Sequence, residues 1–367
     1  MLGFATVDRR VAAVVGLFGV VCPMIFGMAY LLLPPYVGRT LAVRRPPGVH
    51  FAATCLGGVL LTAAELRRPS PEVFLLGALV WSLGVTIFLG SLLWTALPAV
   101  VRRPEVPLRS GDRPQRSTRA ATAAIPVALG YLAVGTIGLL SVAGVPRTGT
   151  PASVPRVLHA YGAGFGALLV FALGARLLIG FFHVRPPRYA AVAVLVCGAI
   201  APALLAAHLW IGPWFRTGGT LEAASMVGYA ALVGSVAARS TWRRVGLYGI
   251  TLGALAGVVA VGFALPVAFG GGRPGLLDAH ATLVLQGFFG PTIVGYAYQF
   301  FPVTAGRFRG ASERTARATI GLLALGTFVR VAGSVSGVSV LYYVGVGVAT
   351  AGAVGYAYLL VRRLLTG

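Results

Sequence analysis

Long apolar runs, separated by short polar segments, follow one another along the whole chain. Each run holds roughly 18 to 27 residues. An α-helix rises about 1.5 Å per residue, so it needs about 20 residues to cross a hydrocarbon core of about 30 Å. We therefore predict about eleven transmembrane helices. They lie near residues 11–33, 49–66, 73–98, 122–145, 157–183, 188–211, 220–238, 245–269, 277–303, 317–336 and 338–361.

The runs are apolar throughout, without the alternation of apolar and polar residues that marks a transmembrane β-strand. The 51 glycines are scattered through the runs instead of being gathered in linkers, and small residues allow transmembrane helices to pack closely. These patterns predict an all-α fold. We expect a polytopic membrane helical bundle that forms a single integral membrane domain over residues 1–367.

The composition excludes a soluble globule. Of the 367 residues, 57% are hydrophobic and only 10% are charged, which leaves too few polar side chains to cover a surface in water. The longest polar stretch, within residues 99–121, is rich in arginine and proline and has too few apolar residues to form a core. We expect this stretch to be a cytoplasmic loop.

Arginine supplies all 30 basic residues, and its distribution predicts the orientation of the chain. About 20 arginines flank the predicted helices on one side, and about eight flank them on the other. Because cytoplasmic loops carry the excess of basic residues, we expect a multi-pass cell-membrane protein with its N-terminus outside and its C-terminus in the cytoplasm. The net charge of +22 indicates membrane lipid as a partner, through its anionic headgroups, and we expect no nucleic-acid partner.

An internal repeat links the first and the ninth predicted helices. Residues 23–39 and 291–307 align without a gap. A third, weaker copy of the repeat lies in the fifth predicted helix, in which His159 aligns with His280. Three such units around an axis would form pseudo-threefold arcs, and duplicated helices often mark a functional centre in membrane proteins. The shared residues of the first two copies are Pro23 and Pro291, Gly27 and Gly295, Tyr30 and Tyr298, Pro34 and Pro302, Gly38 and Gly306, and Arg39 and Arg307.

Three of the five histidines, His159, His208 and His280, fall at a similar predicted depth on the outer side. Imidazole ligates haem iron or copper as a neutral group, so it buries no charge in lipid. Because His159 and His280 are equivalent in the repeat, both are candidate metal ligands. His208 is a further cofactor-binding candidate.

A histidine near the end of a helix also has a purely structural interpretation, in which its polar ring lies among the headgroups. This alternative is favoured for His208, which is followed by Trp210 and Trp214 in a setting typical of an aromatic belt. It is also favoured for His50 and His183, which lie beside proline and arginine at the inner ends of their helices.

Arg330 falls inside the tenth predicted helix, where a charge needs a partner or solvent. It lies on the same side as the three outer histidines, so it is a candidate for binding a haem propionate by a charge-assisted hydrogen bond. The alternative is a structural ion pair with Glu65, Glu222 or Asp278.

Residues 280–302 resemble the tenth helix of subunit I of the haem-copper oxidases, a family that includes nitric oxide reductases. That helix opens with two histidines separated by one residue and reaches a Phe-Pro pair. The resemblance places His280 on the axial ligand of the high-spin haem. Thr282 stands where the family has a ligand of the low-spin haem.

The resemblance extends more weakly to other helices. Residues 23–35 are similar to the second helix of the family, but Ala12 stands at the position of the other low-spin haem ligand. The fifth predicted helix looks like the sixth helix of the family, in which His159 matches a leading histidine and Gly166 stands at a copper ligand. The resemblance therefore implies no copper and no oxygen reduction at a binuclear centre.

Together these features predict a divergent relative of haem-copper oxidase subunit I. We expect one b-type haem on His280, with His159 or His208 nearby, serving redox or nitric-oxide-related chemistry and not proton-pumping oxygen reduction. An electron-transfer or other membrane protein is the expected partner, and whether the chain is an enzyme stays open. Two alternatives remain: a cofactor-free membrane scaffold or partner subunit, and a transporter, which the scarcity of intramembrane acidic residues disfavours.

Overall fold

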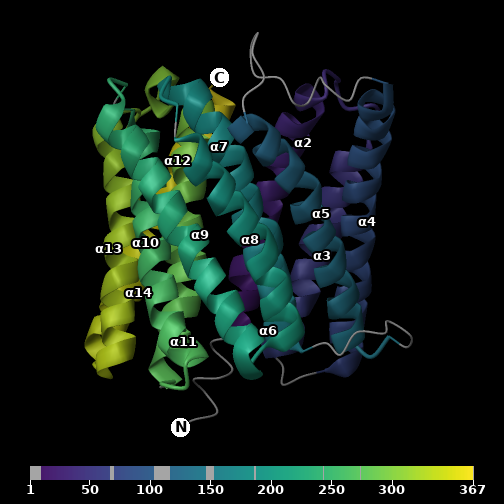
Figure 1. Ribbon diagram of the computed structural model, residues 1–367. Coiled ribbons are helices and arrows are strands. Elements are labelled where there is room, and N and C mark those ends of the chain that lie inside the picture. Colours follow the sequence, from purple (N-terminus) through teal and green to yellow (C-terminus); the bar gives the residue numbers. More distant parts are fainter. Residues whose placement is uncertain are drawn as a thin grey trace. The chain divides into compact units, whose positions relative to one another are not determined.

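The computed structural model describes residues 10–66, 70–102, 116–145, 153–185, 187–242, 244–272 and 274–366. All regular structure in these ranges is helical, and ten of the helices there are long and apolar enough to cross a membrane (Figure 1). The predicted all-α polytopic bundle is confirmed, and the chain is a multi-pass helical membrane protein.

The helices agree closely with the predicted spans. An eleventh continuous helix, from Pro274 to Phe300, is less apolar than the other ten because it carries His280, Gln286 and Gln299. The elements are the helix Arg10–Tyr36, which contains η1 (Val15–Val21) and α2 (Cys22–Tyr36); α3 (Pro46–Leu66); α4 (Pro71–Arg102); α5 (Arg116–Val142); α6 (Val154–His159), η3 (Ala160–Ala167) and α7 (Leu168–Phe182); α8 (Arg188–His208); α9 (Gly212–Arg239); α10 (Val245–Ala268); α11 (Pro274–Thr282), η4 (Leu283–Phe289) and α12 (Gly290–Phe300); η5 (Val303–Ala305); α13 (Glu313–Ser336); and α14 (Ser339–Leu365).

The arginine- and proline-rich stretch is shorter than residues 99–121. α4 continues to Arg102 and α5 begins at Arg116, so both ends of the predicted loop are helical, and residues 103–115 lie outside the described residues. Hydropathy locates the part of a helix that crosses the hydrocarbon, whereas helical hydrogen bonding continues past it into the interface. The sequence pattern therefore ended α4 too early and began α5 too late.

The chain divides into two compact units. Unit 1 comprises Met1–Arg176 and Leu195–Gly218, and unit 2 comprises Leu177–Val194 and Gly219–Gly367. The divisions fall inside α7, α8 and α9, not at the arginine- and proline-rich stretch.

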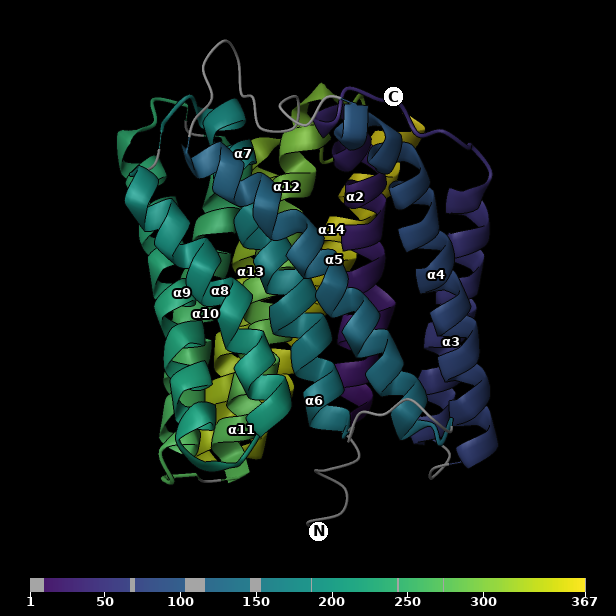
Figure 2. The ribbon, with the colours of Figure 1, turned by 45° about the vertical axis from the view of Figure 1, so that its right-hand side comes forward.

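In unit 1, α3 packs along α4 (Figure 2). α5 packs against η3. The α3–α4 contact depends on glycine: a Cβ added to Gly57 would lie 2.6 Å from the backbone nitrogen of Trp81. The core of this unit is aromatic. Its fully buried rings include Phe26, Phe88 and Tyr161.

In unit 2, α13 packs along α14, and α10 packs against η4 and α12 (Figure 1). Glycines again allow the backbones to approach. A Cβ added to Gly345 of α14 would meet the backbone of Arg330 on α13, and one added to Gly249 of α10 would lie 2.7 Å from the carbonyl oxygen of Pro291. Small residues at such contacts are the usual basis of tight helix packing in membranes.

Three π-helical segments, η1, η3 and η4, lie in the first, fifth and ninth predicted helices. These are the helices that carry the sequence repeat. With Pro23 aligned on Pro291, η1 and η4 coincide residue for residue, and with His159 aligned on His280, η3 overlaps most of η4. π-helical turns are rare and are frequently found at functional sites. The repeat is therefore a feature of backbone conformation as well as of sequence.

Candidate functional site

His280 lies in the second turn of α11, just before η4, and its side chain reaches the neighbouring helix. Its Nδ1 atom is 3.0 Å from the backbone carbonyl oxygen of Ala260 on α10. A carbonyl oxygen only accepts, so Nδ1 carries the proton and the lone pair of the ring is on Nε2. This bond fixes both the tautomer and the direction of the ring.

Small and aliphatic side chains pack tightly around this position. They form a buried cluster that joins α10, α11, η4 and α13, and Ala279 and Ala260 are fully buried in it. The imidazole is half-buried. The members of the cluster are Ala256, Ala260, Ala279, Leu283 and Val331.

A hydrogen bond sets the register of α11 against α13. The hydroxyl of Ser334 donates to Oδ2 of Asp278 at 2.6 Å, and the hydroxyl groups of Tyr298 and Thr319 are 2.9 Å apart further along the antiparallel pair. His280 is two residues from Asp278, and Arg330 is four residues from Ser334 in the same direction along the pair. At 1.5 Å per residue, they lie about 3 Å and about 6 Å from the contact between Asp278 and Ser334. The two residues are therefore at similar depths.

The side chain of Arg330, however, turns to α14. Its Nη2 donates to the hydroxyl of Tyr342 at 3.2 Å, and the guanidinium lies 5.1 Å from the centre of the same ring. Its Nε is buried without a hydrogen-bond partner, and no carboxylate of the described residues lies within ion-pair distance of it. The partner is thus a tyrosine and not one of the three acidic side chains considered from the sequence. His280 thus bonds to α10, and Arg330 bonds to α14.

His159, the repeat equivalent of His280, ends α6 in unit 1. Its Nδ1 is 2.7 Å from the carbonyl oxygen of Pro155, one turn earlier in the same helix. The two equivalent histidines therefore share a bond from Nδ1 to a backbone carbonyl, but His280 makes it across a helix interface and His159 makes it within its own helix.

A small apolar hollow lies beside α6 in unit 1. Val157 and Leu158 line it, together with Glu65, which is its one acidic lining residue. His159 is not among the lining residues. The hollow has room for about one water molecule and is far too small for a haem.

His208, at the end of α8 in unit 1, is half-buried, and its ring centre is 6.3 Å from that of Trp214. This contact agrees with the aromatic-belt interpretation.

Within the described ranges, no group of three or more His, Cys, Asp or Glu side chains is arranged to hold a metal ion. A haem held by a single imidazole would not need such a group.

His50 is more deeply buried than the sequence indicated. Only 3% of its surface is exposed, and its ring centre lies 4.7 Å from Phe26, 5.5 Å from Tyr30 and 5.3 Å from Phe88. Its Nε2 is buried and has no hydrogen-bond partner. The expectation of a ring among the headgroups was wrong, because α3 begins at Pro46 and turns this residue into the core of unit 1. The spacing of His50, Thr54 and Leu61, all buried on one face of α3, was the available signal.

A polar chain fills the centre of unit 1. Trp81 Nε1 donates to the hydroxyl of Tyr161 at 2.9 Å, the hydroxyls of Tyr161 and Thr136 are 2.7 Å apart, and Thr136 donates to the carbonyl of Leu132 at 2.7 Å. Tyr161 follows His159 by two residues, as Thr282 follows His280. Every polar group of this chain has a partner.

Polar groups in unit 2 are less well matched. Thr292 and Gln299 face α10, where a Cβ added to Gly253 would meet the Thr292 hydroxyl and one added to Gly246 would lie 2.5 Å from the Gln299 amide nitrogen. Both side chains are buried and lack hydrogen-bond partners. Buried polar groups without partners are uncommon in proteins.

The ninth predicted helix thus presents His280, Thr292 and Gln299 toward α10, next to a π-helical segment. Among the three histidines singled out from the sequence as ligand candidates, His280 is the one whose ring is hydrogen-bonded across a helix interface. Comparison of the chain with protein-family models, with curated proteins and with solved structures finds no match in any of the three.

Proposed function

We propose that this protein is a divergent relative of haem-copper oxidase subunit I that holds one b-type haem on the imidazole of His280. Its activity would be redox or nitric-oxide-related chemistry in the cell membrane. The observation that carries the proposal is the hydrogen bond from His280 Nδ1 to the carbonyl of Ala260.

The chemistry of that bond suits a ligand to iron. Histidines that bind metals usually donate their other ring nitrogen to a carboxylate or a backbone carbonyl, which fixes the ring and raises its basicity. At His280 this arrangement directs coordination to Nε2. A haem bound there would supply electron transfer or the binding of a diatomic gas. The chain itself would orient the ring through Ala260.

Three of the positions considered from the sequence have no part in this proposal. Arg330 is engaged with Tyr342 on α14, so its contacts do not support a propionate partner. His159 and His208 belong to unit 1, where each has the local contact described above. His280 is therefore the single ligand that we propose, with no copper.

We also propose that the N-terminus is outside the cell and the C-terminus is in the cytoplasm. The support is the excess of arginine on the side of the C-terminus. A membrane or electron-transfer protein would exchange electrons with the haem.

A cofactor-free scaffold or partner subunit is the second candidate function. The polar chain through Trp81, Tyr161 and Thr136 favours it, because the equivalent region of unit 1 is filled by side chains that satisfy one another. In that case the bond between His280 and Ala260 would be a helix-packing contact and nothing more.

Haem titration separates the two candidates. Haemin is added to the purified full-length chain in detergent, and the Soret band is followed for the wild type, for His280→Ala and for the matched control His208→Ala. We expect the wild type and the control to saturate at one haem per chain and His280→Ala to bind none. Equal titration of all three proteins would show that haem does not bind at His280, and no binding by any of them would favour the scaffold; both overturn the proposal.

A further inference from the structure

One end of unit 2 carries a dense group of arginines. They come from the segment that joins α12 to α13, from the first turns of α13 and from the last turn of α14, and one acidic residue, Glu313, lies among them. We call this group the basic site of unit 2. Its members are Arg307, Arg309, Arg314, Arg317, Arg362 and Arg363.

Hydrogen bonds hold the connecting segment against α14. The hydroxyl of Tyr358 donates to the carbonyl oxygen of Arg309 at 2.8 Å, and Arg363 Nε donates to the carbonyl oxygen of Pro302 at 3.1 Å. Gly310 allows the chain to turn back, with a positive φ of 89° that disfavours other residues. The backbone that presents Arg307 and Arg309 therefore has a defined position.

Phe308 brings the two arginine-bearing elements together. Its ring centre lies 6.2 Å from that of Tyr358, and the guanidinium of Arg362 lies 6.0 Å from the same Phe308 ring. Arg362 is one helical turn beyond Tyr358, whose hydroxyl bonds the backbone of Arg309. Arg309 and Arg362 thus belong to one local surface, and both are exposed.

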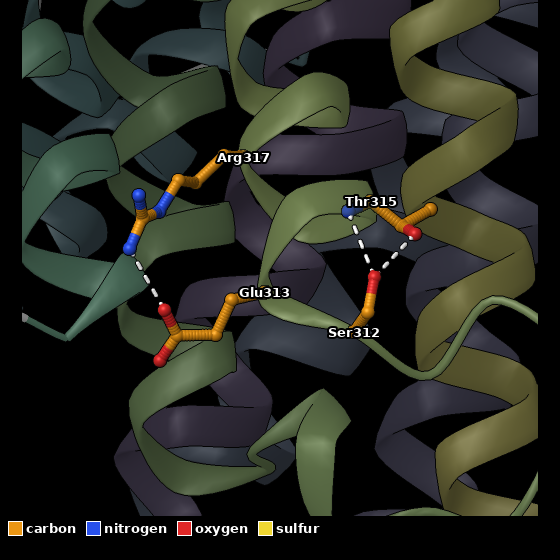
Figure 3. Close-up of polar contacts among 4 residues, drawn as sticks. All are labelled: Ser312, Glu313, Thr315 and Arg317. Carbon is orange, nitrogen blue, oxygen red and sulfur yellow. Dashed lines mark hydrogen bonds and ion pairs between the residues drawn. The ribbon is translucent and has the colours of Figure 1, made fainter.

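The acidic residue of the basic site is already engaged. Glu313 forms an ion pair with Arg317 at 2.8 Å, four residues later on α13 (Figure 3). The first turn of the same helix is capped by Ser312, whose hydroxyl accepts from the backbone nitrogen of Thr315 at 3.1 Å (Figure 3). Within the described residues, no carboxylate is paired with the other arginines of the basic site.

An exposed apolar stripe leads along α14 to this site. Its members are spaced by three or four residues, so they share one face of the helix. Arg362 stands beside the last two of them. They are Val354, Tyr358, Val361 and Leu365, with exposed fractions of 63%, 46%, 53% and 76%.

We infer that the basic site of unit 2 binds the phosphate of an anionic phospholipid, whose acyl chain lies along the α14 stripe. Arginine forms bidentate hydrogen bonds with phosphate oxygens, and clusters of basic residues at the ends of transmembrane helices bind anionic headgroups. The apolar stripe distinguishes this partner from a nucleic acid or a soluble anion, neither of which would cover it. The inference does not depend on haem binding.

The test uses the full-length chain purified in neutral detergent. Its midpoint of thermal unfolding is measured with dioleoylphosphatidylglycerol, with dioleoylphosphatidylcholine, with inorganic phosphate and with a single-stranded oligonucleotide. The variant Arg309→Gln/Arg362→Gln removes two charges of the basic site. The matched control, Arg39→Gln/Arg188→Gln, removes two exposed charges at other helix ends.

We expect phosphatidylglycerol to raise the midpoint of the wild type and of the control by about 3 °C or more and to leave that of the site variant unchanged. Phosphatidylcholine, phosphate and the oligonucleotide should have no effect. A rise with phosphate alone that equals the lipid effect would assign the site to a free anion, and a rise with the oligonucleotide would assign it to nucleic acid; both overturn the lipid assignment.

Native mass spectrometry of the same proteins gives a second measurement that does not depend on stability. We expect phosphatidylglycerol to remain bound to the wild type and to the control and to be lost from the site variant. Equal lipid retention by the site variant and the wild type, or equal loss from the control, would overturn the proposal.

Discussion

His280 Nδ1 and the carbonyl oxygen of Ala260 are 3.0 Å apart across the interface between α11 and α10. The contact requires a small side chain at position 260, because Ala260 is fully buried in the cluster that surrounds it. A histidine held in this way has one defined tautomer and one defined direction, which are the two properties that an iron ligand needs.

Enlarging Ala260 should therefore disturb the site without removing its histidine. We expect Ala260→Leu to lower the free energy of unfolding by about 1–3 kcal/mol, because extra methyl groups overpack a filled interface. Haem binding should weaken in parallel. Gly262→Ala, on the same helix with open space around it, is the matched control and should leave haem binding unchanged and not lower the free energy of unfolding. Haem titration and thermal unfolding measure the two effects, and normal haem binding by Ala260→Leu would contradict this account of the site.

The polar chain in unit 1 makes a separate prediction. Tyr161→Phe removes the hydroxyl that accepts from Trp81 and pairs with Thr136, and it leaves the buried Trp81 N–H without a partner. We expect a loss of about 1–3 kcal/mol in the free energy of unfolding, the usual cost of an unsatisfied buried polar group. Tyr189→Phe, at an exposed position, should cost much less. Equal unfolding midpoints for the two variants would show that the buried chain does not stabilise the fold.

The α13–α14 contact can be tested with two glycines of one helix. A Cβ at Gly345 would meet the backbone of Arg330, which cannot move aside as a side chain can, whereas Gly347 faces open space. We expect Gly345→Ala to destabilise the protein by at least about 1–3 kcal/mol. Gly347→Ala should be neutral or slightly stabilising. The order of the two unfolding midpoints checks this, and a reversed order would show that the helices do not meet at Gly345.

The proposed orientation predicts the behaviour of fusions at the C-terminus. Arginine is concentrated on the side that carries Arg362 and Arg363, the last basic residues of α14. Green fluorescent protein fused after residue 367 should fluoresce, and alkaline phosphatase fused at the same place should be inactive, because each folds on only one side of the membrane. An active phosphatase fusion would reverse the orientation.

The helices were predictable because lipid imposes one simple rule. Every polar backbone group in the hydrocarbon must be satisfied within the chain, so each long apolar run becomes a helix. The predicted span 245–269, for example, is the helix Val245–Ala268. Helix ends such as Arg102 and Arg116 were less predictable, because outside the hydrocarbon the backbone can also bond to water.

The surroundings of the candidate residues could not be obtained in the same way. Arg330 meets Tyr342 because α13 and α14 approach closely at their glycines. His50 is buried because its face of α3 meets the rings of Phe26 and Phe88. Hydropathy indicates how apolar a helix is, but not which side chains of other helices contact it. The repeat identified the helices that contain the π-helical segments, but it did not reveal the π-helical hydrogen bonding itself.

The central claim is that the imidazole of His280 binds iron, and the haem content of the purified protein tests it most directly. The chain is produced in haem-replete cells, and haem per chain is measured by the pyridine haemochrome assay for the wild type and for His280→Ala, with His208→Ala as the control. The account predicts one b-type haem per chain in the wild type and in the control, and none in His280→Ala. A colourless wild-type protein, or a His280→Ala variant with its full haem content, would contradict it.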